Sequence, residues 1–133
     1  MKSFLLILGS ISIFSAGVLH MYFFKLESID WIKPKTWKSF GLPNQEHAEI
    51  IRPMAFNQGF YNLFLALGAI IGTALLSTNT TIGFTLMIFS ASSMALAGLV
   101  LFLSVGNSRR AAMAQALPPL FGILLILLAL GNN

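Results

Sequence analysis

Four long apolar runs dominate the sequence and limit what the chain can fold into. They cover residues 3–24, 54–77, 81–104 and 111–131. A helix needs about 20 mostly apolar residues to cross the hydrocarbon core of a bilayer, where every backbone polar group must be satisfied within the protein. Each run therefore predicts a transmembrane helix, although the run at 54–77 is polar in its first two turns.

The composition supports the same fold class. Hydrophobic residues make up 56% of the 133 residues and charged residues only 9%, whereas a soluble domain carries about 25% charged residues. We predict an all-α membrane protein in which residues 1–133 form one domain, a four-transmembrane-helix bundle with an interfacial first loop. Lys2 before an apolar run also fits a signal peptide, but this run continues past any plausible cleavage site to Phe24.

The basic residues are distributed unevenly between the two sides that four spans define. The termini and the loop at 77–80 share one side, which holds Lys2 alone. The loops at 25–52 and 105–110 share the other side and hold the remaining basic residues, Lys25, Lys33, Lys35, Lys38, Arg52, Arg109 and Arg110. The positive-inside rule places these two loops in the cytoplasm and both termini outside, in a multi-pass inner-membrane protein. Ser39 and Asn132 should then be accessible from opposite sides.

Charge and residue types exclude several classes of function. The net charge is +4, but the basic residues flank apolar runs without forming a dense cluster, which favours the lipid bilayer over nucleic acid as the partner. The absence of cysteine excludes disulfides, thiolate nucleophiles and iron–sulfur ligation. The two histidines and the scattered carboxylates lack the spacing of a metal site, and no nucleotide or hydrolase motif is present. We therefore expect no metal and no cofactor.

The first loop is the only substantial part of the chain outside the predicted spans. Trp31 and Trp37 carry the amphipathic rings that are favoured at the level of the lipid headgroups. A proline at the start predicts a short helix over residues 34–40. Asn44 is a typical N-cap for a second helix over residues 45–51. We expect this loop to lie in the cytoplasmic interface, with a plain connector as the alternative.

Polar side chains inside the spans are the candidate functional residues, because each is costly in hydrocarbon without a partner or water. With about 100° per residue, four polar side chains of the second helix fall within an arc of about 140°. They are Asn57, Gln58, Tyr61 and Asn62. On the first helix, His20 and Glu27 lie about 20° apart in azimuth and roughly 10 Å apart along the axis.

The depth of these residues predicts one site. With Gln115 of the fourth helix, they all belong to the cytoplasmic half of the bundle, so they should converge on a site with a single mouth. Within it we assign ligand binding to Asn57, Gln58, Tyr61, Asn62 and Gln115, and catalysis to His20 and Glu27. A purely structural hydrogen-bond network is the alternative for the second-helix residues, and a solvated carboxylate is the alternative for Glu27.

Three classes of function stay open at this point. The first is binding or transport of a small amphiphilic molecule. The second is a membrane-embedded enzyme, isomerase-like, in which His20 carries a proton and Glu27 orients it. The third is a structural or accessory subunit. Whether the protein is an enzyme is left undecided, as are the ligand and the oligomeric state, with a homo-oligomer among the alternatives.

Small residues in the spans predict close helix packing. Gly68 and Gly72 form a GxxxG pattern in the second span, and Ala91, Ala95 and Gly98 line one side of the third. Small side chains at this spacing let two helix backbones approach closely. The pattern indicates packing and carries no chemistry of its own.

Four stretches of sequence resemble a known family. They are LHMYFFKLE at 19–27, FGL at 40–42, NQGFYNLFLALG at 57–68 and QALPPLFGILLIL at 115–127. These stretches are similar to the small bacterial membrane proteins grouped as domain of unknown function 1304. The resemblance covers nearly the whole chain and implies a four-helix membrane protein, without an activity. The family pattern has Glu-His where this chain has Leu19-His20, so the resemblance implies no acid–base pair at those adjacent positions here.

Overall fold

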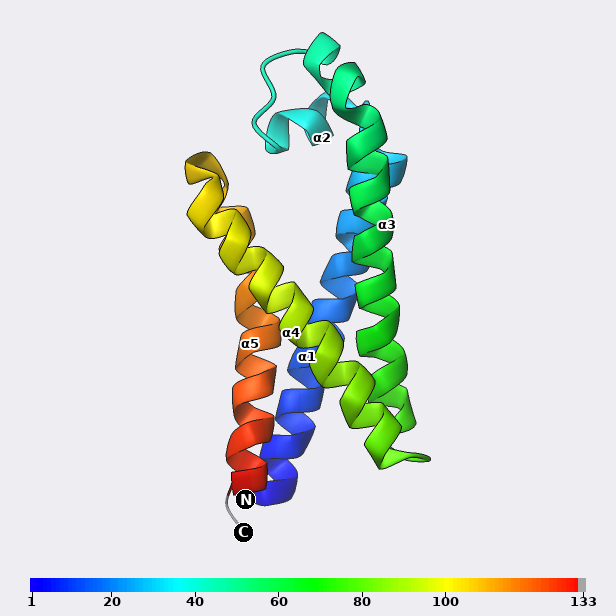
Figure 1. Ribbon diagram of the computed structural model, residues 1–133, viewed down its shortest axis with the longest axis vertical. Helices are drawn as coiled ribbons and strands as arrows, with labels where there is room; N and C mark the ends of the chain where they lie inside the picture. The colour runs from blue at the N-terminus through cyan, green and yellow to red at the C-terminus, as the bar shows by residue number, and fades with distance from the viewer. Residues whose placement is uncertain (132–133) are drawn as a thin grey trace.

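The computed structural model describes residues 1–131, and its regular structure within them is helical throughout (Figure 1). The five α-helices are α1 (Lys2–Phe24), α2 (Pro34–Ser39), α3 (Gln45–Leu75), α4 (Thr80–Ser104) and α5 (Arg109–Gly131). A π-helical segment, Lys25–Ile29, extends α1, and a short 3₁₀ turn, Gly106–Ser108, precedes α5. Asn132, which we chose as a marker of the C-terminal side, lies outside the described residues.

Four of these helical segments are long and apolar enough to cross a membrane. They are Lys2–Ile29, Gln45–Leu75, Thr80–Ser104 and Arg109–Gly131. Their outward faces carry large apolar side chains that water would not tolerate in such number, for example Leu103 at 75% exposure and Phe89 at 70%. The predicted fold class is confirmed: the chain is a multi-pass membrane protein built as a four-helix bundle. The assignment of its loops to the cytoplasm stays a prediction.

The four long helices pack as a ring of neighbours. Helix α1 packs against α3 and α5, and α4 packs against the same two helices. Their shared core combines small alanines with larger methionine and isoleucine side chains, all almost completely buried: Ile13, Ala16, Ala69, Met87, Ala91, Met94 and Ile126. Small residues at helix contacts let the backbones come together, which is how bundles gain van der Waals packing in lipid. In Figure 1 the α4–α5 pair diverges from the α1–α3 pair toward the end of the bundle that carries α2.

Helices α3 and α4 pack backbone to backbone at two glycines. A Cβ atom added to Gly72 would lie 2.6 Å from the Met87 backbone nitrogen and 2.9 Å from the Gly83 oxygen. A Cβ atom on Gly83 would in turn lie 2.9 Å from the Gly72 oxygen. These two glycines therefore let the two helix backbones touch, as the GxxxG pattern of the second span predicts.

The first loop folds back onto the start of α3. Trp31 and Trp37 are buried, and their indole nitrogens donate to the Ala48 carbonyl and to Gln45 Oε1, each at 2.8 Å. The expected short helix is present as α2, and Gly41 ends the turn after it with a φ of +79°. Both rings are enclosed by protein, because α3 begins early enough to offer them backbone and amide partners. Their position at the level of the lipid headgroups stays a prediction.

The helix predicted over residues 45–51 and the second predicted span form one continuous helix, α3. Asn44 caps α3 as expected, with its side chain accepting from the His47 backbone nitrogen at 3.0 Å. The helix does not end at residue 51 but continues through Pro53. Proline removes one backbone donor, and the carbonyl it leaves free is that of Glu49, an exposed residue. Water or headgroups can satisfy that carbonyl, so the helix tolerates the proline.

Candidate functional site

The last turns of α1 place His20 in the interior of the bundle. The ring is fully buried, and its Nδ1 lies 2.9 Å from the Ala16 carbonyl oxygen. A carbonyl only accepts hydrogen bonds, so a neutral ring carries its proton on Nδ1. Nε2 is then a buried acceptor, and it has no hydrogen-bond partner among the residues that the structure describes. The edge of the ring packs against Phe23.

The π-helical segment after α1 turns Glu27 toward α3. Glu27 is only 9% exposed, and its Oε2 accepts a hydrogen bond of 2.6 Å from Asn62 Nδ2 on α3. Asn62 is itself 4% exposed. Short π-helical segments widen a helix by one residue and are frequent at functional sites. Glu27 and Asn62, two predicted site residues that are 35 positions apart in sequence, therefore meet in the interior of the protein.

Glycine and serine hold the two helices close at this level. A Cβ atom on Gly59 of α3 would lie 3.2 Å from the Glu27 Cβ and 3.1 Å from the Ser28 backbone nitrogen. Ser28 Oγ donates to the Phe56 carbonyl at 2.8 Å. Glycine at position 59 therefore leaves room for the Ser28 side chain, which a Cβ atom there would overlap, and lets the π-helical segment lie against α3.

A pocket of about 310 Å³ has Glu27 in its wall. Its walls come from the π-helical segment, the first loop and the first turns of α3. The lining residues are Glu27, Trp31, Phe40, Ile51, Met54, Ala55 and Gln58. The Trp31 and Phe40 rings pack edge to face with centroids 5.1 Å apart. The site therefore combines one carboxyl group and one amide with a mainly apolar and aromatic wall, which is the usual make-up of a ligand pocket.

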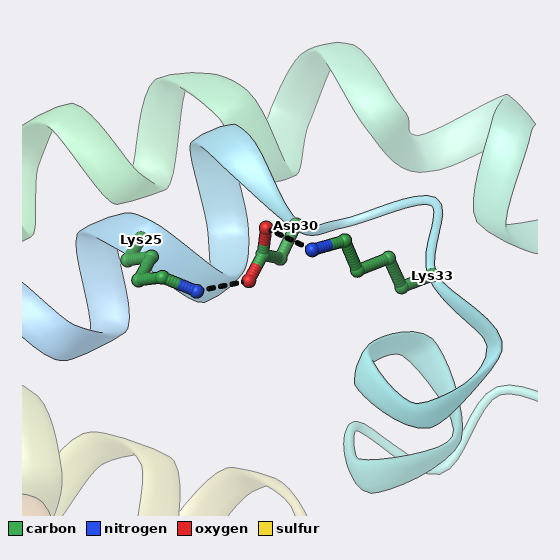
Figure 2. A network of polar contacts seen from close by, with 3 residues as sticks. All are labelled: Lys25, Asp30 and Lys33. Carbon is green, nitrogen blue, oxygen red and sulfur yellow. Dashed lines mark hydrogen bonds and ion pairs between the residues drawn. The ribbon is translucent and has the colours of Figure 1, made fainter.

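The Asp30 carboxylate, three residues after Glu27, already has two cationic partners. Lys25 and Lys33 both pair with its carboxylate, Lys33 Nζ at 2.8 Å from Oδ1 (Figure 2). These two hydrogen-bonded ammonium groups hold the pKa of Asp30 below its ordinary value. Within residues 1–131, no basic side chain lies within ion-pair distance of Glu27. The two carboxyl groups thus differ in their partners: Asp30 pairs with two lysines, whereas Glu27 is hydrogen-bonded to the Asn62 amide.

The remaining predicted residues do not join the Glu27–Asn62 pair. On α3, Asn57 and Tyr61 are exposed, Tyr61 at 55%. Gln58 is exposed as well but lines the pocket. Gln115 of α5 is half-buried and lines neither described pocket. The arc expected on α3 divides because the buried side of α3 at this level carries Ala55, Gly59 and Asn62, so only the Asn62 end of the arc points inward.

Five residues of the pocket wall were not predicted from the sequence: Trp31, Phe40, Ile51, Met54 and Ala55. Trp31 and Phe40 line the pocket, but both belong to a loop whose fold has no periodicity that would aim them at α3. Gly59 was missed too, although a small residue between polar ones was a signal for close approach. Among residues 1–131, no three histidine or carboxylate side chains gather in a way that could hold a metal ion.

A second pocket, of about 450 Å³, is larger but chemically plain. It lies at the other end of the bundle between α1, α3 and α4, and hydroxyls are its only polar side chains. The lining residues are Leu6, Ile7, Ser10, Ile11, Phe14, Thr73, Leu76, Thr80 and Phe84. Without an ionisable group it can accommodate apolar chains but offers little specificity. The smaller pocket at Glu27 is therefore the candidate site.

Comparison with known proteins gives a family and no activity. The family model described as "Protein of unknown function (DUF1304)" matches residues 14–127, which include every residue of the candidate pocket. No curated protein and no solved structure shows a significant match to this chain. The match covers most of the chain and agrees with the resemblance carried by its four sequence stretches. This membrane protein belongs to the DUF1304 family.

Proposed function

We propose that this protein binds a small amphiphilic molecule in the pocket beside Glu27, entered from the side of the first and third loops. The observation that supports this proposal most is the buried Glu27 carboxyl group at the wall of an apolar pocket. A buried carboxyl group costs stability unless it is well satisfied. Among the described residues, Asn62 is its one hydrogen-bond partner.

The pocket wall suits a ligand with one polar end. Trp31, Phe40 and Met54 offer apolar area, while Glu27 and Gln58 offer hydrogen-bonding groups. A volume of about 310 Å³ is at the lower end of the range for ligand pockets, which favours a short chain or a single ring. By the positive-inside assignment the ligand would come from the cytoplasmic leaflet or the cytoplasm.

Acid–base catalysis at His20 is supported less well. The ring is fully buried, lines neither pocket and has its Nδ1 proton engaged by its own helix. A general base must be within hydrogen-bond reach of the proton it abstracts, and no described pocket brings a substrate there.

Two single-tryptophan variants test the pocket directly. The chain has two tryptophans, of which Trp31 lines the pocket and Trp37 does not. Trp37→Phe leaves Trp31 as the only fluorophore, and Trp31→Phe leaves Trp37. Short amphiphiles carrying bromine, a collisional quencher, would be titrated into each variant in lipid nanodiscs, using cationic, neutral and anionic head groups.

We expect at least one head group to quench Trp31 saturably and to leave Trp37 nearly unchanged. Unspecific partitioning into the bilayer would quench both tryptophans alike and without saturation. If every amphiphile behaves in that way, the proposed binding function is wrong.

A further inference from the structure

We infer that the ligand carries a protonated amine, which binds the Glu27 carboxylate; this inference rests on the proposed function and names its ligand class. Asn62 already donates to Glu27 Oε2 at 2.6 Å. The other carboxyl oxygen has no hydrogen-bond partner among residues 1–131 and belongs to a side chain that lines the pocket. A carboxylate only accepts hydrogen bonds, so the ligand must donate.

The local charges favour a cation over a neutral donor. The nearest basic side chains along the chain, Lys25 and Lys33, both pair with Asp30 and leave Glu27 without a counter-ion (Figure 2). Charge-assisted hydrogen bonds are roughly twice as strong as neutral ones. An ammonium ion would therefore supply both the missing donor and the missing positive charge.

The same charges disfavour an anionic ligand. A carboxylate or phosphate head in this pocket would face Glu27 with no cation to offset the repulsion. Gln58, the other polar wall residue, carries no charge. Lys25 and Lys33 already pair with Asp30, and neither lines the pocket.

The aromatic wall fits the same ligand class. Trp31 and Phe40 form part of the pocket, and ammonium groups are attracted to the faces of aromatic rings, most strongly to tryptophan. The carboxyl group and the apolar wall together fit a small lipophilic amine. Its nitrogen would bind Glu27, and its carbon chain would pack against Trp31, Phe40 and Met54.

A head-group series on one carbon chain tests this inference. Octylamine, octanol and octanoate share a chain that suits the pocket and differ only in the polar end. The full-length protein would be placed in nanodiscs of zwitterionic lipid, so that the bilayer itself has no net charge to attract the amine. Calorimetric titration of each compound, corrected with empty nanodiscs, gives its affinity for the protein.

The wild-type protein should bind octylamine at least tenfold more tightly than octanol, and octanoate more weakly than both. Glu27→Gln keeps a side-chain oxygen for Asn62 but removes the charge. It should lower the octylamine affinity at least tenfold, which corresponds to about 1.4 kcal/mol, and change the octanol affinity much less, because only the ammonium group loses an opposite charge. Glu46→Gln is the matched control, because Glu46 is exposed and lies outside the pocket.

The outcomes separate this inference from the proposed function. If octanol or octanoate binds the wild-type protein as tightly as octylamine, the cation inference is wrong, while amphiphile binding stands. Retention of octylamine binding by a folded Glu27→Gln variant would overturn it too. The wild-type series does not depend on that variant folding. If none of the three compounds binds saturably, the proposed function is wrong together with the inference.

Discussion

Replacing Gly72 with alanine would put a methyl group into a backbone-to-backbone contact between α3 and α4. The added Cβ would lie 2.6 Å from the Met87 backbone nitrogen and 2.9 Å from the Gly83 oxygen. Ordinary van der Waals contact begins at 3.4 Å, so the shorter distance falls 0.8 Å below it. Both opposing atoms belong to the backbone of α4 and cannot turn away as a side chain would. The helices must therefore separate along their whole contact.

Two opposing effects decide how this substitution changes the free energy of unfolding. Overpacking of a well-packed interior typically costs about 1–3 kcal/mol, while alanine is preferred over glycine within a helix by up to about 1 kcal/mol. We expect a net loss of about 1–2 kcal/mol, which lowers the ratio of folded to unfolded protein roughly 5- to 30-fold. Gly72→Ala with Gly83→Ala should cost less than the two single changes together, because the first change already opens the shared contact.

Reversible unfolding by dodecyl sulfate in mixed micelles, followed by circular dichroism, measures this loss. Gly131→Ala is the matched control: it is the same substitution, at the last residue of α5, where an added Cβ would meet nothing within 4 Å. The control should be neutral or slightly stabilising. If Gly72→Ala unfolds at the same dodecyl sulfate fraction as the wild-type protein, the backbone contact between α3 and α4 does not exist as described.

Three further predictions concern topology, the polar pair and the loop charges. Cysteines introduced at Ser39 and Ser77 should react with a membrane-impermeant maleimide from opposite sides, Ser39 from the cytoplasm; reaction of both from one side would refute the four-span topology. Asn62→Leu should lower the free energy of unfolding by about 1–3 kcal/mol, because Glu27 is left without its hydrogen bond, and an unchanged unfolding curve would contradict the pairing. Two lysines hold the pKa of Asp30 below its ordinary value. The ion pairs therefore stabilise the fold at pH values above that ordinary pKa, and this contribution is lost as the pH falls through the lowered pKa. A carbon-detected titration midpoint of the Asp30 carboxyl group at or above its ordinary value would show that these pairs do not form.

Part of the candidate site was predictable, and the reason is energetic. His20, Glu27 and Asn62 stood out because polar groups in a span are costly, and all three are buried in the structure. The same argument selected Asn57 and Tyr61, which are exposed. The energetic cost of burial predicts that a polar residue in a span needs a partner. It does not predict which side of the helix faces that partner.

The sequence by itself determined the four spans, the N-cap at Asn44 and the short helix after Lys33. These features depend on residues close together in the chain: a long apolar run, one capping side chain or one proline. A bilayer leaves the backbone of such a run no alternative to a helix. That is why the fold class could be stated before any contact between helices was known.

Only the tertiary structure decided which side chains meet. Glu27 pairs with Asn62 because it belongs to a π-helical segment that lies against α3, where glycine at position 59 leaves room for the neighbouring Ser28 side chain. Trp31 became a pocket wall because α3 starts well before its apolar run and gives the indole nitrogen a carbonyl to bind. Such contacts depend on how two helices cross, which is set by the sum of many small packing energies along both and by no local sequence pattern.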